Sequence, residues 1–413
     1  MKKINIFLIT VAFLVVSAGV KAQVVKSGIC GANLTWQLTG TGTNLTLTIS
    51  GTGDMYNFVT GVSPWAAQRD SIKTLILPNG ITSIGDYAFH RCIPLTGTLT
   101  IPTSVTSIGV AAFAYCRGFT GPLTIPNSVN SIGSSAFYGC RGFSGALAIP
   151  DSVTSLKNYV FFGCSGFNGA LTIPNSVDTI EYSAFESCSN LTGNITIPNV
   201  VSMGSKAFYN CSKLSGALDI PNSMTSIPDY AFYGCSGLTS LTIPNSIKKI
   251  PTFAFQNCGF TSITLSDSIT VIKDSAFVGC NNIIAVINYK DTPQVINANV
   301  FTATAYANAT LYVNTMSQSA YFAATGWQNF KKVTSAVENI YSNNLKLYPN
   351  PVKYELFIEN LQIDNLPFTI FDLTGKQMVN SQWLNGKSIN VSSLPSGVYI
   401  LKIGEYRGKF VKE

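Results

Sequence analysis

The sequence predicts a mostly β protein with short helical turns: a solenoid of about 23–24-residue units, followed by a small C-terminal β-sandwich. Two observations predict the solenoid. A Phe, with a Cys three residues after it, recurs nine times, and charged residues make up 11% of the chain where about a quarter is usual. A third observation predicts the sandwich, because the Phe–Cys register is gone after Lys332 and short alternating strands follow.

The repeat has a fixed order of residue types. The recurring aromatic residues are Phe89, Phe113, Phe137, Phe161, Phe185, Phe208, Phe232, Phe255 and Phe277, and the cysteines are Cys92, Cys116, Cys140, Cys164, Cys188, Cys211, Cys235, Cys258 and Cys280. A Pro ends a short apolar alternation in eight units, from Pro78 to Pro244, and Ser266 takes the ninth place. The period is 24 residues in the early units and falls to 23 and 22 later. These Phe and Cys side chains are predicted to form a buried ladder.

One unit shows how the ladder arises. In residues 171–174, Leu and Ile alternate with Thr, as in a half-buried strand, and a Pro without an N–H group ends that strand. Ala184, Phe185 and Cys188 have the spacing of one helical turn with its face inward. Each unit has a single apolar side, so the units can bury a core only by stacking.

This unit resembles the BspA-like, or treponemal-type, leucine-rich repeats. The run Leu238 to Pro244, with Ala231-Phe232 and Cys235 before it, fits that pattern closely, whereas earlier units carry one extra residue before the strand. The resemblance implies a leucine-rich-repeat solenoid, predicted over 72–333 with a closing cap from about 285, and an N-terminal cap over 23–71. In the N-terminal cap, Leu45 to Gly53 alternates as a strand leading into a Gly-rich turn. As a class, BspA-like proteins are associated with adhesion and with binding host or bacterial surface proteins.

The cysteines allow three interpretations. Adjacent coils should lie about 4.8 Å apart, which is within disulfide range, yet nine equivalent side chains pointing one way cannot all pair. Zinc sites need close pairs of Cys or added His ligands, and the chain has one His. We favour a ladder of buried thiols over a few disulfides, with a metal site last. The tenth cysteine, Cys30, could pair with Cys92 if the N-terminal cap lies over the first coil.

Residues for catalysis are not assembled in the sequence. Acyl-transfer catalysis needs a base beside a nucleophile, and the one His, His90, occupies a variable position after the core Phe that we expect to be exposed. Asp219 has no evident carboxylate partner for glycoside hydrolysis, and the Gly residues form no phosphate loop. We therefore predict no enzyme activity, no cofactor and no metal.

Two outward rows are the candidate binding residues. The outward strand positions include Thr100, Thr124, Thr172, Thr196, Asp219, Thr242 and Thr264, and the aromatic positions after the core Phe are Tyr138, Phe162, Tyr209 and Tyr233. The first row could meet a partner by shape and many weak hydrogen bonds, although Thr is also simply a good exposed strand residue. Exposed Tyr is favoured at interfaces.

The two ends of the chain indicate export. Residues 1–22 read as a signal peptide, with Lys2 and Lys3 before an apolar run too short to span a bilayer comfortably. After a linker over 334–344, the run Tyr348 to Pro351, the Asp372 to Lys376 turn and the run Leu394 to Tyr399 resemble the type A sorting domain of the type IX (Por) secretion system, over 345–413. This resemblance implies recognition by the type IX secretion machinery and passage through the periplasm to the cell surface or the extracellular space.

The function predicted from these features is that of a secreted or cell-surface leucine-rich-repeat protein mediating protein–protein interaction or adhesion, with an unknown protein or surface ligand, host or bacterial, as its partner. The alternatives are a passive structural component of a surface layer or biofilm matrix, and an enzyme whose site lies in the caps. The formal net charge is +7, of which three charges lie in the leader, leaving +4 without a basic stripe, so we expect no nucleic-acid binding. No segment after the leader is predicted to cross a membrane.

Overall fold

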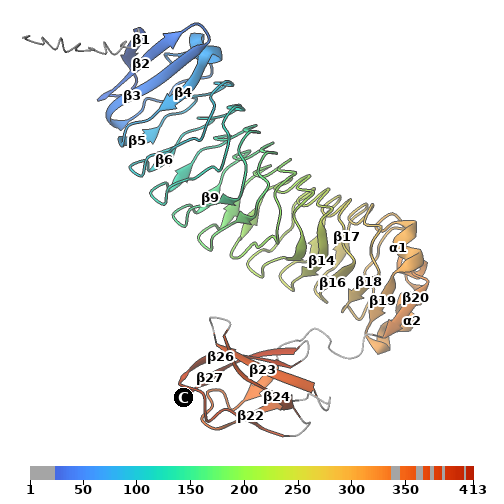
Figure 1. Ribbon diagram of the computed structural model, residues 1–413. Helices are drawn as coiled ribbons and strands as arrows, with labels where there is room; N and C mark the ends of the chain where they lie inside the picture. The colour runs from blue at the N-terminus through green and yellow to red at the C-terminus, as the bar shows by residue number, and fades with distance from the viewer. Residues whose placement is uncertain (1–23, 336–344, 360–365, 373–375, 384–386, 404–405) are drawn as a thin grey trace, which may run out of the picture.

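The computed structural model describes residues 24–335, 345–359, 366–372, 376–383, 387–403 and 406–413. The fold class predicted from the sequence is confirmed: most regular structure is β, and the repeats stack into an elongated solenoid (Figure 1). The predicted signal peptide lies outside the described residues, as does residue 336 onward of the predicted linker.

The solenoid begins with an antiparallel hairpin. Strands β1 (Val24–Ile29), β2 (Leu34–Thr41) and β3 (Asn44–Asp54) pair in order, and β3 also pairs in parallel with β4 (Ile72–Ile76) and β5 (Gly80–Ile84). The 3₁₀ helix η1 (Ala66–Ser71) connects the hairpin to β4. The predicted Gly-rich turn at the end of the Leu45 to Gly53 run is instead part of β3. Gly51 and Gly53, with φ of 109° and 92°, let this strand bend from one side of the first coil to the next.

Each complete coil contributes up to two short parallel strands. The strands before the repeat Pro are β8 (Leu147–Ala148), β10 (Leu171–Thr172), β13 (Gly216–Asp219), β14 (Leu238–Ile243), β16 (Ser262–Leu265) and β18 (Ala285–Asn288). The strands after it are β6 (Ser107–Ile108), β7 (Ser131–Ile132), β9 (Ser155–Leu156), β11 (Thr179–Ile180), β12 (Ser202–Met203), β15 (Lys249–Ile250) and β17 (Val271–Ile272). Neighbouring coils pair residue to residue, as Thr242 pairs with Thr264.

The extra residue of the early units shortens their strands. β8 and β10 contain two residues each, whereas β14, from a unit without the insertion, contains six. In early units the inserted turn holds Gly97, Gly121 and Gly145 at positive φ, and Pro122 has no N–H to donate to a ladder. The register shifts at Gly216, where an early unit pairs with a later one.

The segment that carries each core Phe is a run of tight turns, and its backbone differs from the regular helical turn that the spacing predicts. Residues two before and two after the Phe are left-handed, as in Ala111 (φ 49°) and Tyr115 (φ 63°) around Phe113. Alternate N–H groups then bond within the coil and to the next one: Cys116 N–H reaches Phe113 O at 3.0 Å, and Phe113 N–H reaches Ala136 O at 2.8 Å. The left-handed residues thus turn every second N–H group toward the next coil, which a helix could not do.

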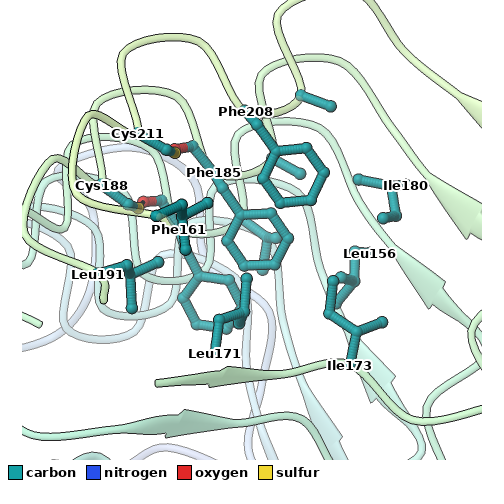
Figure 2. Close-up of a cluster of buried hydrophobic side chains, with 14 of the residues drawn as sticks. Leu156, Phe161, Leu171, Ile173, Ile180, Phe185, Cys188, Leu191, Phe208 and Cys211 are labelled. Atoms are coloured by element: carbon teal, nitrogen blue, oxygen red, sulfur yellow. Dashed lines mark hydrogen bonds between the residues drawn. The ribbon is translucent and has the colours of Figure 1, made fainter. Parts of the chain in front are cut away.

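A continuous aromatic stack runs along the solenoid core. All nine repeat Phe side chains are fully buried, and consecutive rings stack with centroids 5.2–5.8 Å apart. Figure 2 shows three of them, Phe161, Phe185 and Phe208. Trp65 begins the stack, 5.6 Å from Phe89, and Phe301 continues it, 5.2 Å from Phe277. In Figure 2, Leu171 and Ile173 line the same core from the strand, with Ile180 on a second side.

The far end is closed by small helices and two strands. These are α1 (Ala303–Asn308), β19 (Thr310–Val313), η2 (Thr315–Ser317), α2 (Gln318–Ala323), η3 (Trp327–Asn329) and β20 (Lys332–Ser335). Thr302 caps α1 by accepting a hydrogen bond from Ala305 N–H. Trp327 is fully buried over Phe301 and donates its indole N–H to Gln294 O at 2.8 Å. Because β20 pairs with β19, the solenoid extends into the first two residues of the predicted linker.

The C-terminal region contains two antiparallel sheets around their own core. One consists of β21 (Lys346–Tyr348), β22 (Glu355–Glu359) and β25 (Ile389–Asn390), and the other of β23 (Leu366–Asp372), β24 (Gln377–Trp383), β26 (Gly397–Ile403) and β27 (Tyr406–Lys412). Leu356 and Val391 pack with Ile370 and Leu401 in a cluster separate from the solenoid core. This arrangement agrees with the predicted small β-sandwich.

Candidate functional site

The predicted strand row forms one line across the coils. Its residues Thr100, Thr124, Thr172, Thr196, Asp219 and Thr242 are exposed, and Thr264 is half-buried. Parallel pairing places Asp219 beside Thr242 and Thr242 beside Thr264. The row continues through Ile287 and Tyr312, which the sequence analysis missed because the Phe–Cys register stops short of them.

The predicted aromatic row lies partly between adjacent coils. Tyr138, Phe162, Tyr209 and Tyr233 are half-buried, because their ring faces cover one another between adjacent coils. Tyr138 and Phe162 stack with centroids 4.5 Å apart and planes 9° apart, and Tyr209 and Tyr233 stack at 4.6 Å and 7°. Glu186 takes the same position between the two pairs, where it accepts a hydrogen bond from the Ser183 hydroxyl at 2.6 Å.

The structure adds five aromatic residues to this row, and we call the combined surface the aromatic edge. Its members are Tyr115, Tyr138, Tyr159, Phe162, Tyr182, Tyr209, Tyr230, Tyr233 and Phe253. The added rings contact the row or each other: Tyr115 lies 5.0 Å from Tyr138, Tyr159 lies 5.2 Å from Tyr182, and Tyr230 lies 4.9 Å from Phe253. The signal was present in the sequence, since most of these residues stand two positions from a repeat Phe, on the left-handed residues of the turn.

The strand row and the aromatic edge are not brought together. The side chains of the strand row belong to the strand that carries Leu171 and Ile173. The aromatic edge lies on the turn that carries Phe185 (Figure 2). The solenoid therefore presents two separate rows on different sides of each coil.

Sequence reasoning also missed a polar groove of about 520 Å³ near the N-terminal end, lined by Asp54, Asn57, Asp86 and the strands β5, β6 and β7. Its two carboxylates are already bonded within the protein. Asp86 Oδ1 accepts from Val110 N–H at 2.6 Å, and hydrogen bonds from Thr82 and Ser83 lower the pKa of Asp54. Both carboxylates of the groove are therefore engaged in hydrogen bonds within the protein.

All ten cysteines are free thiols, so the disulfide interpretation, including a Cys30–Cys92 pair, is wrong. From Cys116 to Cys280 each thiol donates a hydrogen bond to the carbonyl oxygen of the Phe in the preceding coil, at 3.0–3.1 Å. Burial raises the pKa of Cys30 to about 11 and that of Cys92 to about 12. Among the described residues, no group of three His, Cys, Asp or Glu side chains is placed to hold a metal ion.

His90 is half-buried, contrary to the exposure expected from its variable position. Its ring packs edge-on against Tyr87 and Tyr115, with centroids 5.7 and 6.0 Å away. Burial lowers the pKa of His90, and the neighbouring charges of Arg91 and Arg69 lower it further. The imidazole is thus held by aromatic rings and faces cationic neighbours, an environment unlike that of a triad base oriented by a carboxylate.

Comparison with known sequences identifies two regions. Residues 63–144, 111–235 and 201–328 match the BspA type leucine rich repeat region, in six copies, and residues 346–413 match a secretion system C-terminal sorting domain. Neither describes a catalytic family. No curated protein gives a match to the chain.

Several solved structures are similar at low identity. A leucine-rich repeat protein from Bacteroides ovatus is 21% identical with a TM-score of 0.49, covering 73% of this chain and 92% of its own. A leucine rich cell surface protein from Faecalibacterium prausnitzii is 23% identical (TM-score 0.41; 74% and 94% covered), and a T. pallidum leucine rich repeat protein is 25% identical (TM-score 0.34; 45% and 91%).

The sorting domain establishes the destination of the chain. It directs export by the type IX secretion machinery to the cell surface or extracellular space, as predicted from the sequence. Within the described part of the chain, no helix is both long and apolar enough to cross a membrane.

Proposed function

The chain belongs to the BspA-type leucine-rich-repeat family and ends in a secretion sorting domain, and from this premise we propose that it is a non-catalytic, surface-displayed binding protein whose solenoid holds a protein partner. In this proposal residues 1–22 are a leader, 23–71 cap the solenoid, the repeats run from 72 to the end of β20, and 345–413 direct secretion.

The aromatic edge is the observation that carries the proposal. Tyr is enriched where proteins meet, because it offers a large apolar body and a polar tip at little cost in conformational entropy. Here the rings of Tyr209 and Tyr233 stack with their centroids 4.6 Å apart. The rings of Tyr138 and Phe162 stack in the same way, with their centroids 4.5 Å apart. Rings fixed in this way lose little further freedom on binding, which favours affinity.

The strand row supports the proposal less strongly. Its Thr side chains lie on a flat, nearly uncharged face whose one acidic member is Asp219. Such a face can contact a partner by shape, but exposed Thr also needs no explanation beyond its preference for strands. A protein that used only this face in lateral packing would be a passive component of a surface layer or matrix.

The two functions are separated by a capture experiment with the full mature chain. The immobilised chain is exposed to surface proteins extracted from bacterial and host cells, beside the double variant Tyr209→Ser with Tyr233→Ser and the double variant Thr172→Lys with Thr196→Lys. We expect specific capture that the Tyr variant loses and the Thr variant retains. If neither the native chain nor any variant captured a protein, the result would favour the passive structural role and contradict the binding proposal.

A further inference from the structure

Three arginines occupy consecutive coils at the N-terminal end of the aromatic edge. Arg91 follows Phe89 by two residues, and Arg117 and Arg141 each follow a ladder Cys directly, so that they share one position in adjacent coils. All three side chains are exposed. The same position in the next two coils is Ser165 and Ser189, so the arginines end at Arg141.

Tyr115 lies among these arginines and orients two of them. The guanidinium carbon of Arg91 is 5.5 Å from the centroid of the Tyr115 ring, and that of Arg117 is 5.3 Å away. A guanidinium packed on an aromatic face keeps its N–H donors free for a planar acceptor. Arg91, Tyr115, Arg117 and Arg141 are called the Arg–Tyr cluster below.

The positive charge of the cluster has no carboxylate partner among the described residues. In the described residues the one ion pair within 4.0 Å joins Lys157 to Glu181, so none of the three guanidinium groups has a carboxylate partner there. Burial lowers the pKa of the neighbouring His90, and the charges of Arg91 and Arg69 lower it further, so two cationic groups act on this end of the edge.

We propose that the Arg–Tyr cluster is a binding site for an extended acidic segment of a protein partner, with carboxylates on the guanidinium groups and apolar atoms against the tyrosine rings of the edge. This inference rests on the proposed binding function, to which it adds the chemistry of the partner.

The spacing of these coils is compatible with an extended peptide. Successive core rings in these coils are 5.2 and 5.6 Å apart, and alternate side chains of an extended strand are about 7 Å apart, a difference that the flexible stem of Arg can span. Carboxylates match the guanidinium fork in a bidentate manner. A nucleic acid would need a longer basic stripe than three residues on adjacent coils.

The test measures binding of fluorescent poly-L-glutamate to the full mature chain at low salt, beside polygalacturonate, which carries the same carboxylates on a sugar backbone. We expect saturable binding of polyglutamate that weakens with salt and is stronger than that of polygalacturonate. The double variant Arg117→Gln with Arg141→Gln should raise the Kd for polyglutamate by about tenfold or more. The double variant Lys248→Gln with Lys249→Gln removes two adjacent exposed charges elsewhere on the solenoid and should leave the Kd unchanged.

Three results would overturn the inference: no binding of polyglutamate, equal loss in the Lys and Arg variants, or equal or tighter binding of polygalacturonate, which would assign the cluster to acidic glycans. Because the Arg side chains are exposed, the variants should retain the native thermal transition. If polyglutamate fails while Tyr-dependent capture of a partner persists, the acidic-segment inference falls and the proposed function stands. If capture fails as well, both fall.

Discussion

The Sγ atom of Cys188 lies 3.0 Å from the carbonyl oxygen of Phe161 in the preceding coil and donates a hydrogen bond to it. The same bond recurs from Cys116 to Cys280, so the cysteine column connects adjacent coils beside the stack of Phe rings (Figure 2). The Cys of this repeat is therefore both a small apolar residue and a donor to a buried carbonyl group.

Replacing Cys188 by Ala should lower the free energy of unfolding by about 1–2 kcal/mol, because it removes a buried sulfur atom and leaves the Phe161 carbonyl without its donor. Urea denaturation followed by circular dichroism measures the effect. Cys188→Ser keeps a donor in place, and the comparison separates the hydrogen bond from the packing. If the Ala variant were as stable as the native chain, the bond would contribute nothing to stability.

We expect ten free thiols per chain after denaturation without reductant, because all ten cysteines are free in the structure. In the native protein their reaction with a thiol reagent at neutral pH should be slow. Burial raises the pKa of Cys235 to about 12 and that of Cys92 similarly, so very little reactive thiolate is present. A denatured count below ten would show disulfides and contradict the thiol ladder.

Replacing Phe185 by Ala should cost about 3–5 kcal/mol, because the ring is fully buried and stacks on Phe161 and Phe208 at 5.7 and 5.2 Å. Thr172→Ser, on the exposed strand row of the same coil, is the control and should cost little. The shift of the urea midpoint measures both. Small, equal losses in the two variants would contradict the assignment of Phe185 to the core.

The solenoid could be predicted in detail because each feature of the coil is repeated in the sequence. The Phe–Cys spacing located the core, whereas the shorter strands of the early units, which carry an inserted residue, are seen in the structure. The turn around each Phe could not be predicted from spacing alone. Ala184, Phe185 and Cys188 would face inward on a helical turn as well as on the observed tight turns, and only the left-handed residues Ser183 and Ser187 distinguish them.

The ends of the stack and the exposed site were harder to predict. Trp65 and Phe301 continue the ring stack without a Cys three residues later, so they stand outside the Phe–Cys register. The position of the aromatic row follows from the repeat, but the sequence does not show which rings cover each other's faces in adjacent coils, as Tyr138 and Phe162 do. The Arg–Tyr cluster arises from contacts between coils, and no single unit contains it.

The stability of the N-terminal coils should fall as the pH is lowered below about 6.5. Burial, with the charges of Arg91 and Arg69, lowers the pKa of His90 from its ordinary value of 6.5. The unfolded chain therefore takes up the proton first as the pH falls, and stability that is present above 6.5 is lost as the pH falls toward the folded pKa.

His90 is the only His in the sequence, so His90→Gln isolates this effect. Urea midpoints at pH 7.5 and 5.0 should differ more for the native chain than for the variant, with carboxylate contributions common to both. The same pH dependence in both proteins would show that His90 titrates equally in the folded and unfolded states.

Trp65 closes the N-terminal end of the ring stack, and its replacement should expose that end. The side chain is fully buried, stacks on Phe89 at 5.6 Å, and donates its indole N–H to Ala88 O at 2.8 Å. Trp65→Ala removes the ring and should cost about 3–5 kcal/mol of the free energy of unfolding. Trp65→Phe keeps a ring on Phe89 but loses the hydrogen bond and part of the packed volume, so it should cost about 1–3 kcal/mol.

Each repeat contacts only its neighbours, so the loss of stability on replacing Trp65 should be concentrated in the hairpin and first coils. Hydrogen exchange should accordingly accelerate in β2, β3 and β5 and remain unchanged in β14 and β16. Uniform acceleration along the whole solenoid would show that the stack unfolds as one unit rather than from its end.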